Sequence, residues 1–304
     1  MKSSNKKILI VGGTGFLGHH LVNRFLKKKY SVTSLSLNSP RKTHYFKKAK
    51  YLKCDLNNFN KLSLVLKNQN FDYVINAGGY VDHSNSKKVF LTHFNGTKNL
   101  CKILLKKNIK KFVQIGSSVE YGFSKSPHQE GDPYKGKMHT TYIKGKLKSS
   151  NYVIDLWKKY NFPSLVFRIY LAYGPNQDTN RLIPAIIKNC LKDNNFPCSN
   201  GKQIRDFVYI DDVIDAIIFS LNSNKVLGQI YNLGSGKPVK VYTVIDTINK
   251  IIKKGKPEYG KIKLRSDESL KFYPSVKKIK KIIKNFPKIN LKKGLIKTIK
   301  FYKK

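Results

Sequence analysis

Short apolar runs alternate with amphipathic stretches along the first half of the chain. Apolar runs bounded by turn residues predict buried strands, and apolar positions recurring every three or four residues predict helices. The predicted strands cover residues 7–11, 31–37, 51–54, 73–76, 112–116 and 164–168, and the predicted helices cover about 16–28, 87–107 and 142–159. This alternation predicts an α/β fold with a doubly wound parallel sheet, which places its ligands at the carboxyl ends of the strands.

Beyond Gly174 and Pro175 the pattern loosens, with helices predicted over residues 182–191 and 211–221. Residues 239–304 hold short helices separated by glycine and proline, too irregular for a core of their own. A docked C-terminal helix is predicted from apolar residues at helical spacing, namely Leu291, Leu295, Ile296, Ile299 and Tyr302. We expect a main domain formed by residues 1–174 and 203–238, and a smaller lobe formed by 175–202 and 239–304 over the sheet's C-terminal edge.

Length and composition allow a substantial buried core, since 40% of the 304 residues are hydrophobic. No apolar run approaches the ~20 residues of a membrane helix, and the N-terminal MKSSNKKILIVGG lacks the apolar stretch of a secretory signal. The cysteines stand far apart in no metal-binding spacing, at Cys54, Cys101, Cys190 and Cys198. The histidines His19, His20, His83 and His93 form no metal-like cluster, and surface or loop roles are expected for them. We expect a cytoplasmic protein with reduced thiols, no membrane contact and no metal site.

The formal net charge of +43 is nearly all lysine, spread over the whole chain. A nucleic-acid partner is not expected, because the sequence has no arginine-rich arm, zinc site or aromatic RNA-binding signature. Lysine on solvated faces is the simpler interpretation, and its positive field would concentrate phosphate-bearing ligands. Arginine is scarce and is expected where a planar two-pronged donor matters, as at phosphates. The six arginines are Arg24, Arg41, Arg168, Arg181, Arg205 and Arg265.

A glycine-rich segment, GGTGFLG over residues 12–18, follows a predicted strand and opens a predicted helix. Glycine at positions 12, 15 and 18 lets the backbone turn tightly and lets a pyrophosphate approach. The helix N-terminus then meets the negative charge with free N–H groups and its dipole. The segment predicts the dinucleotide-binding loop of a Rossmann fold.

The end of the second predicted strand indicates which dinucleotide is bound. NAD sites usually carry Asp or Glu there to hold the ribose hydroxyls. This chain has Ser36 at that position, no acidic residue before Lys53, and the cations Arg41 and Lys42 in between. A hydroxyl with nearby cations suits a 2′-phosphate, so NADP(H) is predicted over NAD(H), unless Arg41 and Lys42 are two more surface cations of a basic chain.

Tyr142 and Lys146 lie four residues apart on one face of a predicted helix. A neighbouring ammonium stabilises the tyrosine phenolate, so the phenol can exchange a proton with a carbonyl or an alcohol. The helix follows the strand that ends in GSSVEYG, residues 116–122. The Ser117 hydroxyl at that strand end can reach the same substrate oxygen.

These motifs resemble those of the extended short-chain dehydrogenase/reductases, the nucleotide-sugar epimerase, dehydratase and reductase group. The resemblance covers nearly the whole chain. Beyond the glycine loop and the Ser117, Tyr142 and Lys146 spacing, the matching segments are CDL at 54–56, NAGG at 76–79, GTKNL at 96–100, YGP at 173–175, RDFVYIDDV at 205–213 and YNLGSG at 231–236. It implies that the main domain is an NAD(P)-binding Rossmann domain and that the smaller lobe binds the substrate.

The resemblance also implies residue roles. Tyr142 would be the acid/base, Lys146 its partner and ribose anchor, and Ser117 a second hydroxyl on the reacting oxygen. Arg205 and Arg265 would clamp the nucleotide diphosphate; Arg168 and Arg24 are expected to be structural and exposed, respectively. The implied cofactor-binding residues are Gly12, Gly15, Phe16, Leu17, Gly18, Ser36, Arg41, Asp55, Leu56, Ala77, Gly78, Gly79, Tyr142, Lys146 and Tyr170, and the implied substrate-binding residues are Ser117, Val119, Arg181, Arg205 and Arg265.

Departures from the group's motifs narrow the reaction. Dehydratases of the group carry Asp-Glu after the hydroxyl residue, where this chain has Ser118 and Val119, so dehydration is disfavoured. Related 3,5-epimerase/reductases carry a cysteine where this chain has Val119, which cannot move a proton. Reduction of a C4 keto group on a 6-deoxy nucleotide sugar by NADPH is the favoured interpretation, with an NAD-dependent 4-epimerase as the alternative. A homodimer is expected from the resemblance, and a non-catalytic dinucleotide-sensing or nucleic-acid-associated protein is the remaining hypothesis.

Overall fold

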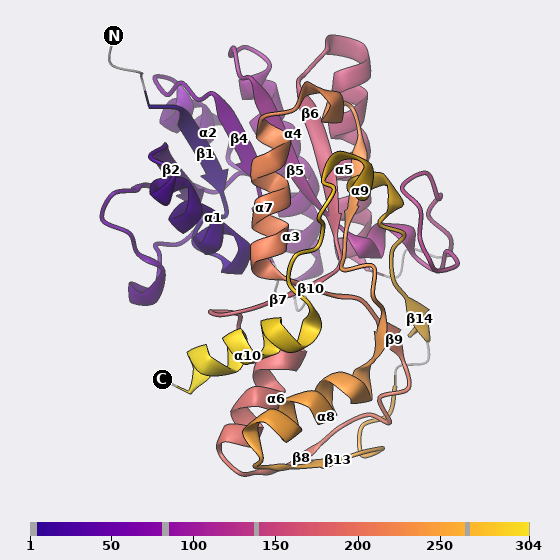
Figure 1. Ribbon diagram of the computed structural model, residues 1–304. Helices are drawn as coiled ribbons and strands as arrows, with labels where there is room; N and C mark the ends of the chain where they lie inside the picture. Colours follow the sequence, from indigo (N-terminus) through magenta and orange to yellow (C-terminus); the bar gives the residue numbers. More distant parts are fainter. Residues whose placement is uncertain (1–4, 81–84, 137–139, 265–267, 304) are drawn as a thin grey trace. The chain divides into compact units, whose positions relative to one another are not determined.

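The computed structural model describes residues 5–80, 85–136, 140–264 and 268–303 (Figure 1). The chain divides into two compact units. The first comprises Met1–Gly122, Tyr134–Arg168 and Ile214–Tyr231, and the second comprises Phe123–Pro133, Ile169–Val213 and Asn232–Lys304. The sequence-based division instead joins 123–133, 169–174, 203–213 and 232–238 to the cofactor domain, and that division stays a prediction.

A seven-stranded sheet has the strand order β11-β6-β5-β4-β1-β2-β3. Its strands are β1 (Lys7–Val11), β2 (Ser31–Ser36), β3 (Lys50–Lys53), β4 (Tyr73–Asn76), β5 (Lys111–Ser117), β6 (Ser164–Ile169) and β11 (Ile230–Leu233). β1 pairs in parallel with β2 and β4, with Val11 opposite Leu35 and Asn76, so the carboxyl ends of the three strands lie level. The doubly wound sheet is therefore confirmed, and β11 is a strand that the sequence reading did not predict.

Helices cover both faces of this sheet (Figure 1). Helices α2 (Phe59–Leu66), α4 (Gly96–Leu104) and α5 (Thr141–Tyr160) pack side by side on one face. Their buried apolar side chains join those of the strands in one core, with Leu62, Leu100 and Val153 fully buried beside Leu9 and Phe112. Burial of this kind stabilises by about 25 cal/mol per Å² of apolar surface, which is why the amphipathic pattern decides where each helix lies.

On the other face lie α1 (Phe16–Lys27) and α7 (Ile210–Leu221). Arg24 of α1 donates to Asp215 of α7 at 2.5 Å, and its side chain is 30% exposed. Arg24 was expected to be an exposed helix residue, and that expectation is wrong, because α7 lies beside α1 and presents a carboxylate to it.

The helix predicted over 87–107 is interrupted. The structure has α3 (Ser86–Phe90), a π-turn over Leu91–Asn95 and α4. At the start of α4, Gly96 is required by close packing, because a Cβ there would lie 2.8 Å from Leu56 Cβ. Hydrophobic periodicity does not reveal a π-turn, because the turn inserts a single residue and the apolar face continues on either side of it.

The described residues of the second unit, taken by itself, form short strands and helices. The helices are α6 (Leu182–Leu191), α8 (Val241–Ile252), α9 (Lys277–Ile282) and α10 (Leu291–Tyr302). The strands are β7 (Leu171–Tyr173), β8 (Asn195–Pro197), β9 (Ile204–Arg205), β10 (Phe207–Tyr209), β12 (Val239–Lys240), β13 (Lys256–Glu258) and β14 (Lys271–Phe272), which form sheets of order β10-β7, β12-β9-β14 and β13-β8. The helix α10 packs on α6 and α8.

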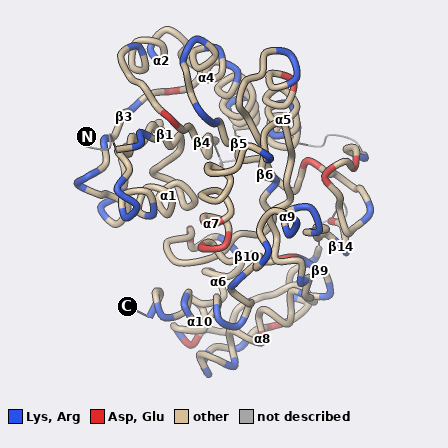
Figure 2. The backbone as a smooth tube through the Cα atoms, turned by 45° about the horizontal axis from the view of Figure 1, so that its top comes forward, with Lys and Arg blue, Asp and Glu red and all other residues tan. Residues whose placement is uncertain are grey.

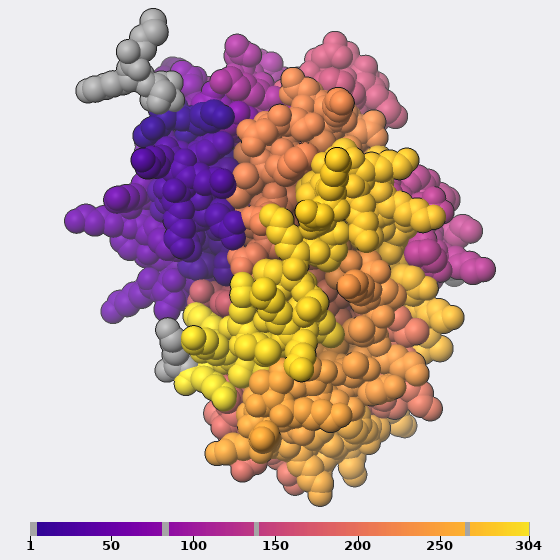
Figure 3. All heavy atoms as spheres, in the orientation of Figure 1, coloured from indigo at the N-terminus to yellow at the C-terminus, as the bar shows by residue number. Residues whose placement is uncertain are grey.

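The predicted C-terminal helix is confirmed, but its buried face differs in one position. Leu295 and Ile299 are buried, whereas Ile296 is 46% exposed. Gly294 and Thr298 complete the buried stripe, which follows the four-residue spacing of one helix face. In the space-filling view the C-terminal segment, in yellow, lies at the surface of the face shown (Figure 3).

No helix within the described residues is long and apolar enough to cross a bilayer. Lysine and arginine are spread over both units (Figure 2), although β2, β4 and α7 carry none. The net charge of +43 is thus distributed along the fold and not gathered in one segment.

Candidate active site

The glycine loop between β1 and α1 has a backbone that only glycine fits. Gly12 has φ +76°, and a Cβ on it would lie 2.7 Å from the Ala77 carbonyl oxygen. A Cβ on Gly18 would collide with the Gly12 carbonyl oxygen. Gly15 is exposed and caps α1 without a side-chain hydrogen bond, and no acidic residue occupies the first turn. The helix N-terminus therefore offers backbone N–H groups and a positive dipole end, which fit a dinucleotide diphosphate.

Next to this loop, the end of β4 supplies Asn76, Ala77, Gly78 and Gly79. Asn76 is buried and donates to Thr97 Oγ1 at 3.0 Å and to Gln114 Oε1 at 2.9 Å. Its own Oδ1 accepts the Gly78 N–H at 3.3 Å, which holds the turn against the glycine loop. The structure therefore brings two of the predicted cofactor segments together.

A cavity of about 50 Å³ lies at the end of β2. It is lined by Thr14, Ser34, Ser36, Asn38, Ser39, Pro40, Tyr51, Leu52 and Lys53, so its lining holds hydroxyls, an amide and one cation but no carboxylate. Ser36 Oγ accepts from the Thr14 backbone N–H at 3.4 Å, which ties this cavity to the glycine loop. Arg41 begins the following 3-10 turn and is exposed, but the lining cation is Lys53, which the sequence reading did not single out.

Two histidines support the glycine loop and were not predicted. His44 Nδ1 lies 3.0 Å from the Thr14 carbonyl oxygen, and the His19 ring stacks on His44 with centroids 4.2 Å apart. His19 is only 5% exposed. Burial, and then the charge of His44, lower the pKa of His19 to about 4. The expectation that His19 has a surface or loop role is wrong, because the loop after β2 folds over α1.

Asp55 and Leu56, the predicted adenine contacts, follow β3. Asp55 Oδ1 accepts from the Asn57 backbone at 2.9 Å and from Asn57 Nδ2 at 3.1 Å. Leu56 is buried, with its Cδ1 3.6 Å from the position of a Cβ on Gly78. The adenine contact itself stays a prediction.

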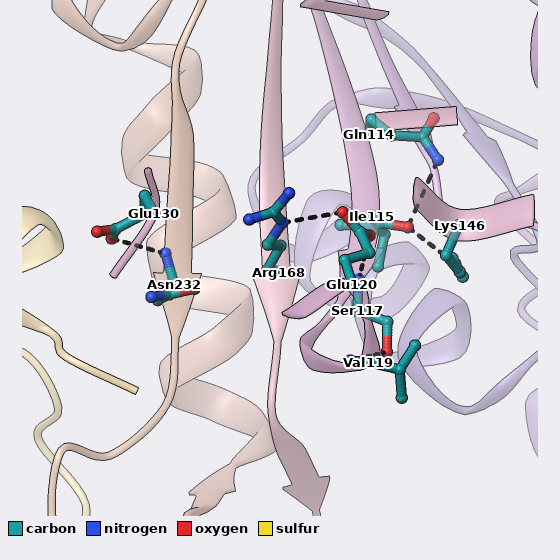
Figure 4. A network of polar contacts seen from close by, with 9 residues as sticks. All are labelled: Gln114, Ile115, Ser117, Val119, Glu120, Glu130, Lys146, Arg168 and Asn232. Carbon is teal, nitrogen blue, oxygen red and sulfur yellow. Dashed lines mark hydrogen bonds and ion pairs between the residues drawn. The ribbon is translucent and has the colours of Figure 1, made fainter. Parts of the chain in front are cut away.

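The end of β5 carries Ser117 in a capping box. Ser117 Oγ accepts from the Val119 N–H at 3.4 Å, and the Ser117 N–H donates to Glu120 Oε1 at 2.7 Å (Figure 4). Glu120 is fully buried, and its Oε2 lies 2.9 Å from Arg168 Nε. Burial alone would lower the pKa of Arg168, but Glu120 and Tyr121 outweigh burial and raise that pKa. Arg168 therefore holds the turn that presents Ser117.

Tyr142 and Lys146 lie in the first two turns of α5, which packs on β5. The Thr140 side chain caps this helix by accepting from the Ile143 N–H at 3.3 Å. Lys146 is 6% exposed, and its ammonium donates to the Ile115 carbonyl at 2.9 Å, two residues before Ser117 (Figure 4). Tyr142 is half-buried, and its ring lies edge-to-face with that of His93. The structure thus gathers the predicted Ser–Tyr–Lys set around the end of β5.

Val119 follows Ser117 in the first unit, whereas the predicted substrate-binding arginines that the structure describes, Arg181 and Arg205, lie in the second unit. Arg205 on β9 is bridged to Glu268 at 2.6 Å, and its side chain is 12% exposed. Burial lowers the pKa of Arg205, against the opposing effect of Glu268. Arg181 precedes α6 and is exposed. Arg265 lies outside the described residues.

Beside Arg205, the sequence reading missed Asp206. Asp206 is fully buried and accepts the backbone N–H groups of Ser235 at 2.5 Å and Gly236 at 2.7 Å. Burial raises the pKa of Asp206, and those N–H bonds oppose the rise. Its position within RDFVYIDDV was a usable signal, because an acidic residue inside an apolar run is seldom buried without partners.

Tyr170, a predicted cofactor residue, is also buried in the second unit. Its hydroxyl lies 2.8 Å from His128 Nδ1, and His128 Nε2 lies 2.9 Å from the Ser124 carbonyl oxygen. A carbonyl only accepts, so Nε2 carries the proton and Nδ1 accepts from the tyrosine. Within the described residues, no group of His, Cys, Asp or Glu could hold a metal ion.

A glycine loop at a helix N-terminus, together with a Ser–Tyr–Lys set at a neighbouring strand end, defines a dinucleotide-dependent enzyme of the Rossmann class. A sequence model of the NAD dependent epimerase/dehydratase family matches residues 8–234. The chain belongs to this family. Its enzymes modify nucleotide sugars with an NAD(P) cofactor.

Individual relatives agree with this assignment. The human dTDP-D-glucose 4,6-dehydratase is 26% identical over 98% of this chain and 90% of its own length. A putative UDP-glucose 4-epimerase of Methanocaldococcus jannaschii is 28% identical over 97% of this chain and 98% of its own. The UDP-glucose 4-epimerase of Thermus thermophilus, solved in complex with NAD, matches the fold with a TM-score of 0.87 at 21% identity, over 98% of this chain and 99% of that one.

Proposed function

We propose that this protein is an NAD(P)-dependent nucleotide-sugar 4-epimerase, which oxidises the sugar at C4 and reduces it again from the other face. The observation that carries this proposal is the Ser117, Tyr142 and Lys146 set at the end of β5, in the same sheet as β1 and its glycine loop. Epimerases among the family relatives favour this reaction over the one-way reduction expected from the sequence. Homologues bind nucleotide-diphosphate sugars, which we take as the substrate class here.

In the proposed cycle, the glycine loop and the cavity at the end of β2 would hold the dinucleotide, which would supply the hydride acceptor and donor for C4 of the sugar. Tyr142 takes the proton of the C4 hydroxyl as the carbonyl forms, and gives it back as the carbonyl is reduced, so atoms and electrons balance over the cycle. Ser117 donates a hydrogen bond to the same oxygen, where negative charge develops. The Lys146 ammonium is held by the Ile115 carbonyl at 2.9 Å, one helical turn after Tyr142, where it would anchor the ribose of the dinucleotide.

Dehydration is disfavoured by the turn after Ser117. Ser118 and Val119 stand where dehydratases of the family carry Asp-Glu, and Ser118 is buried. The one carboxylate of the turn, Glu120, is fully buried and engaged by Arg168 and by the Ser117 N–H. It is thus unavailable as an acid or base toward C5 and C6 of a sugar.

A second candidate, an NADPH-dependent 4-ketoreductase acting on a 6-deoxy nucleotide sugar, is supported by the cavity at the end of β2. That cavity is lined by five hydroxyl side chains, from Thr14, Ser34, Ser36, Ser39 and Tyr51, and by the Lys53 cation, with no carboxylate. Such a lining accepts a 2′-phosphate more readily than it binds a free ribose diol. NADP(H) is therefore our proposed cofactor preference, with NAD(H) as the alternative.

The state of the cofactor in the purified protein separates the two reactions. We expect an epimerase to retain its dinucleotide, released on denaturation, and to convert UDP-glucose or dTDP-glucose to the 4-epimer without added cofactor. Reversible binding of NADPH, with consumption of one NADPH per dTDP-4-keto-6-deoxyglucose, would replace the epimerase by the reductase. Absence of both activities across UDP-, dTDP-, CDP- and GDP-sugars would contradict the enzymatic proposal.

The role of Tyr142 is tested by its phenylalanine variant. Loss of the acid/base hydroxyl should lower kcat by about 100- to 10,000-fold, with dinucleotide affinity largely unchanged. Tyr152→Phe is the matched control, because Tyr152 lies on the same helix and its ring packs against Phe94. Wild-type turnover in Tyr142→Phe would refute the assignment of the acid.

The expected homodimer also stays a proposal. The resemblance implies pairing through the helix that carries Tyr142 and Lys146, which is α5 (Thr141–Tyr160). Sedimentation equilibrium at micromolar concentration should give twice the mass of one chain, and a monomer would contradict the proposal.

A further inference from the structure

The π-turn between α3 and α4 has a cause in buried side chains. A π-turn breaks the regular i→i−4 pattern, so a backbone carbonyl inside it needs another donor. The His93 carbonyl accepts from Thr97 Oγ1 at 2.7 Å and from Ser149 Oγ at 2.7 Å. Two hydroxyls from different helices therefore stabilise the turn at His93.

This arrangement extends to the cofactor segment on β4. Thr97 Oγ1 also accepts from Asn76 Nδ2 at 3.0 Å. Asn76, Thr97 and Ser149 are each at most 2% exposed, so the bonds form a buried network from the end of β4 through the π-turn to α5. Buried networks whose members are satisfied are rigid, because every alternative arrangement leaves a polar group unpaired.

The network places the His93 side chain between two glycines. A Cβ on Gly79 would overlap His93 Cε1, and a Cβ on Gly145 would lie 3.0 Å from His93 Cβ. The imidazole is edge-to-face with the Tyr142 ring, at 5.0 Å between centroids and 80° between planes. His93 Nε2 lies 3.2 Å from the Tyr80 carbonyl, so this nitrogen donates and fixes the ring's orientation. The expectation of a surface or loop role for His93 is wrong, since the residue is 4% exposed.

We propose that His93 is a positioning residue that sets the orientation of the Tyr142 ring toward the reacting oxygen. The proposal rests on the acid/base role proposed above for Tyr142. Tyr142 lies in the first turn of α5, where backbone groups have few intrahelical bonds, so the helix itself restrains it least. A rigid ring held from β4 and α5 supplies the restraint that the helix end lacks.

The test compares His93→Leu with Phe94→Leu. Phe94 is the next residue of the π-turn, and its ring packs against Phe90 and Tyr152 on the other side. We expect His93→Leu to lower kcat by about 100-fold, as for a catalytic group misplaced by about 1 Å, with KM and dinucleotide Kd changed less than about threefold. Phe94→Leu should keep kcat within about threefold of wild type.

A conservative variant keeps the test decisive. His93→Phe retains a ring against Tyr142 and should recover most of the turnover lost in His93→Leu. If His93→Leu keeps wild-type kcat, if Phe94→Leu loses as much, or if His93→Phe is as inactive as His93→Leu, positioning by the ring is contradicted. Dinucleotide titration of each variant identifies those that fail to fold. If His93→Leu fails to fold, the turnover of His93→Phe relative to wild type decides the test, and a loss of about 100-fold contradicts positioning by the ring.

A second readout needs no substrate. In protein labelled with ring-¹³C tyrosine, the Tyr142 resonance is identified by its loss in Tyr142→Phe. His93→Leu should shift that resonance, because it removes the ring current of an imidazole whose centroid lies 5.0 Å from that of the Tyr142 ring, while Phe94→Leu should leave it in place. An unmoved resonance contradicts the contact. Failure to find any turnover, with the resonance shifted as expected, would contradict the proposed function and leave the contact established.

Discussion

Replacing Arg168 with methionine removes the cation of the ion pair beneath the end of β5. The Arg168 and Glu120 side chains are 5% and 0% exposed, and Nε and Oε2 lie 2.9 Å apart (Figure 4). Glu120 then keeps one N–H donor, from Ser117, but loses its counter-charge. A carboxylate left buried without its partner typically costs about 3–5 kcal/mol, which is a large part of the ~5–15 kcal/mol of a folded domain.

The double variant Glu120→Gln/Arg168→Met distinguishes the loss of the ion pair from the cost of leaving one buried charge without its partner. Removing both charges together avoids the unpaired state, so we expect it to cost less than Arg168→Met alone, by about 2 kcal/mol. Arg24→Met is the matched control: its pair with Asp215 is 30% and 35% exposed, and such pairs contribute at most about 1 kcal/mol.

Urea unfolding followed by circular dichroism measures these differences. If Arg168→Met lowers the free energy of unfolding by less than about 1 kcal/mol, other groups must compensate the buried Glu120 carboxylate, and the reasoning is refuted. The single variant Glu120→Gln completes the comparison. If the double variant loses as much free energy of unfolding as Arg168→Met and Glu120→Gln lose together, the two residues are not coupled.

Three further predictions concern pH, a helix end and the substrate. Burial alone would raise the pKa of Asp72, but the Lys110 ammonium and the Lys7 backbone N–H outweigh it and lower that pKa. The stabilisation by Asp72 is therefore present above about pH 4 and lost as pH falls further. In Asp72→Asn, the urea midpoint of unfolding should therefore fall less steeply below about pH 4 than it does in the wild type, and an equally steep fall would contradict this. Lys111→Met removes an ammonium that donates to three carbonyls at the end of α7, and should lower the free energy of unfolding by about 1–3 kcal/mol in urea titrations; an unchanged midpoint would contradict this. Arg205→Lys keeps the charge but loses the planar fork, so KM for the nucleotide sugar should rise about tenfold with kcat little changed, and an unchanged KM would contradict the diphosphate role.

The periodic elements could be predicted from the sequence alone. The strand Lys7–Val11 and the helix Leu182–Leu191 have the expected bounds, because an apolar run and a helical apolar stripe can each be satisfied by one local structure. The glycine loop could also be predicted locally, because the positive φ of Gly12 and the close approach at Gly18 require glycine, and the sequence shows glycine directly. The Tyr142 and Lys146 pair was found because helical spacing places both on one face.

Only the tertiary structure decided which polar groups meet. Glu120 pairs with Arg168, and Arg205 with Glu268, across long stretches of sequence that carry no periodic signal. The π-turn and the burial of His93 depend on hydroxyls from Thr97 and from α5, which come together only when the chain has folded. Apolar burial is non-directional, so a local pattern of apolar residues is enough to predict it. A hydrogen bond or an ion pair needs two particular atoms at a particular distance, and only the fold as a whole sets that distance.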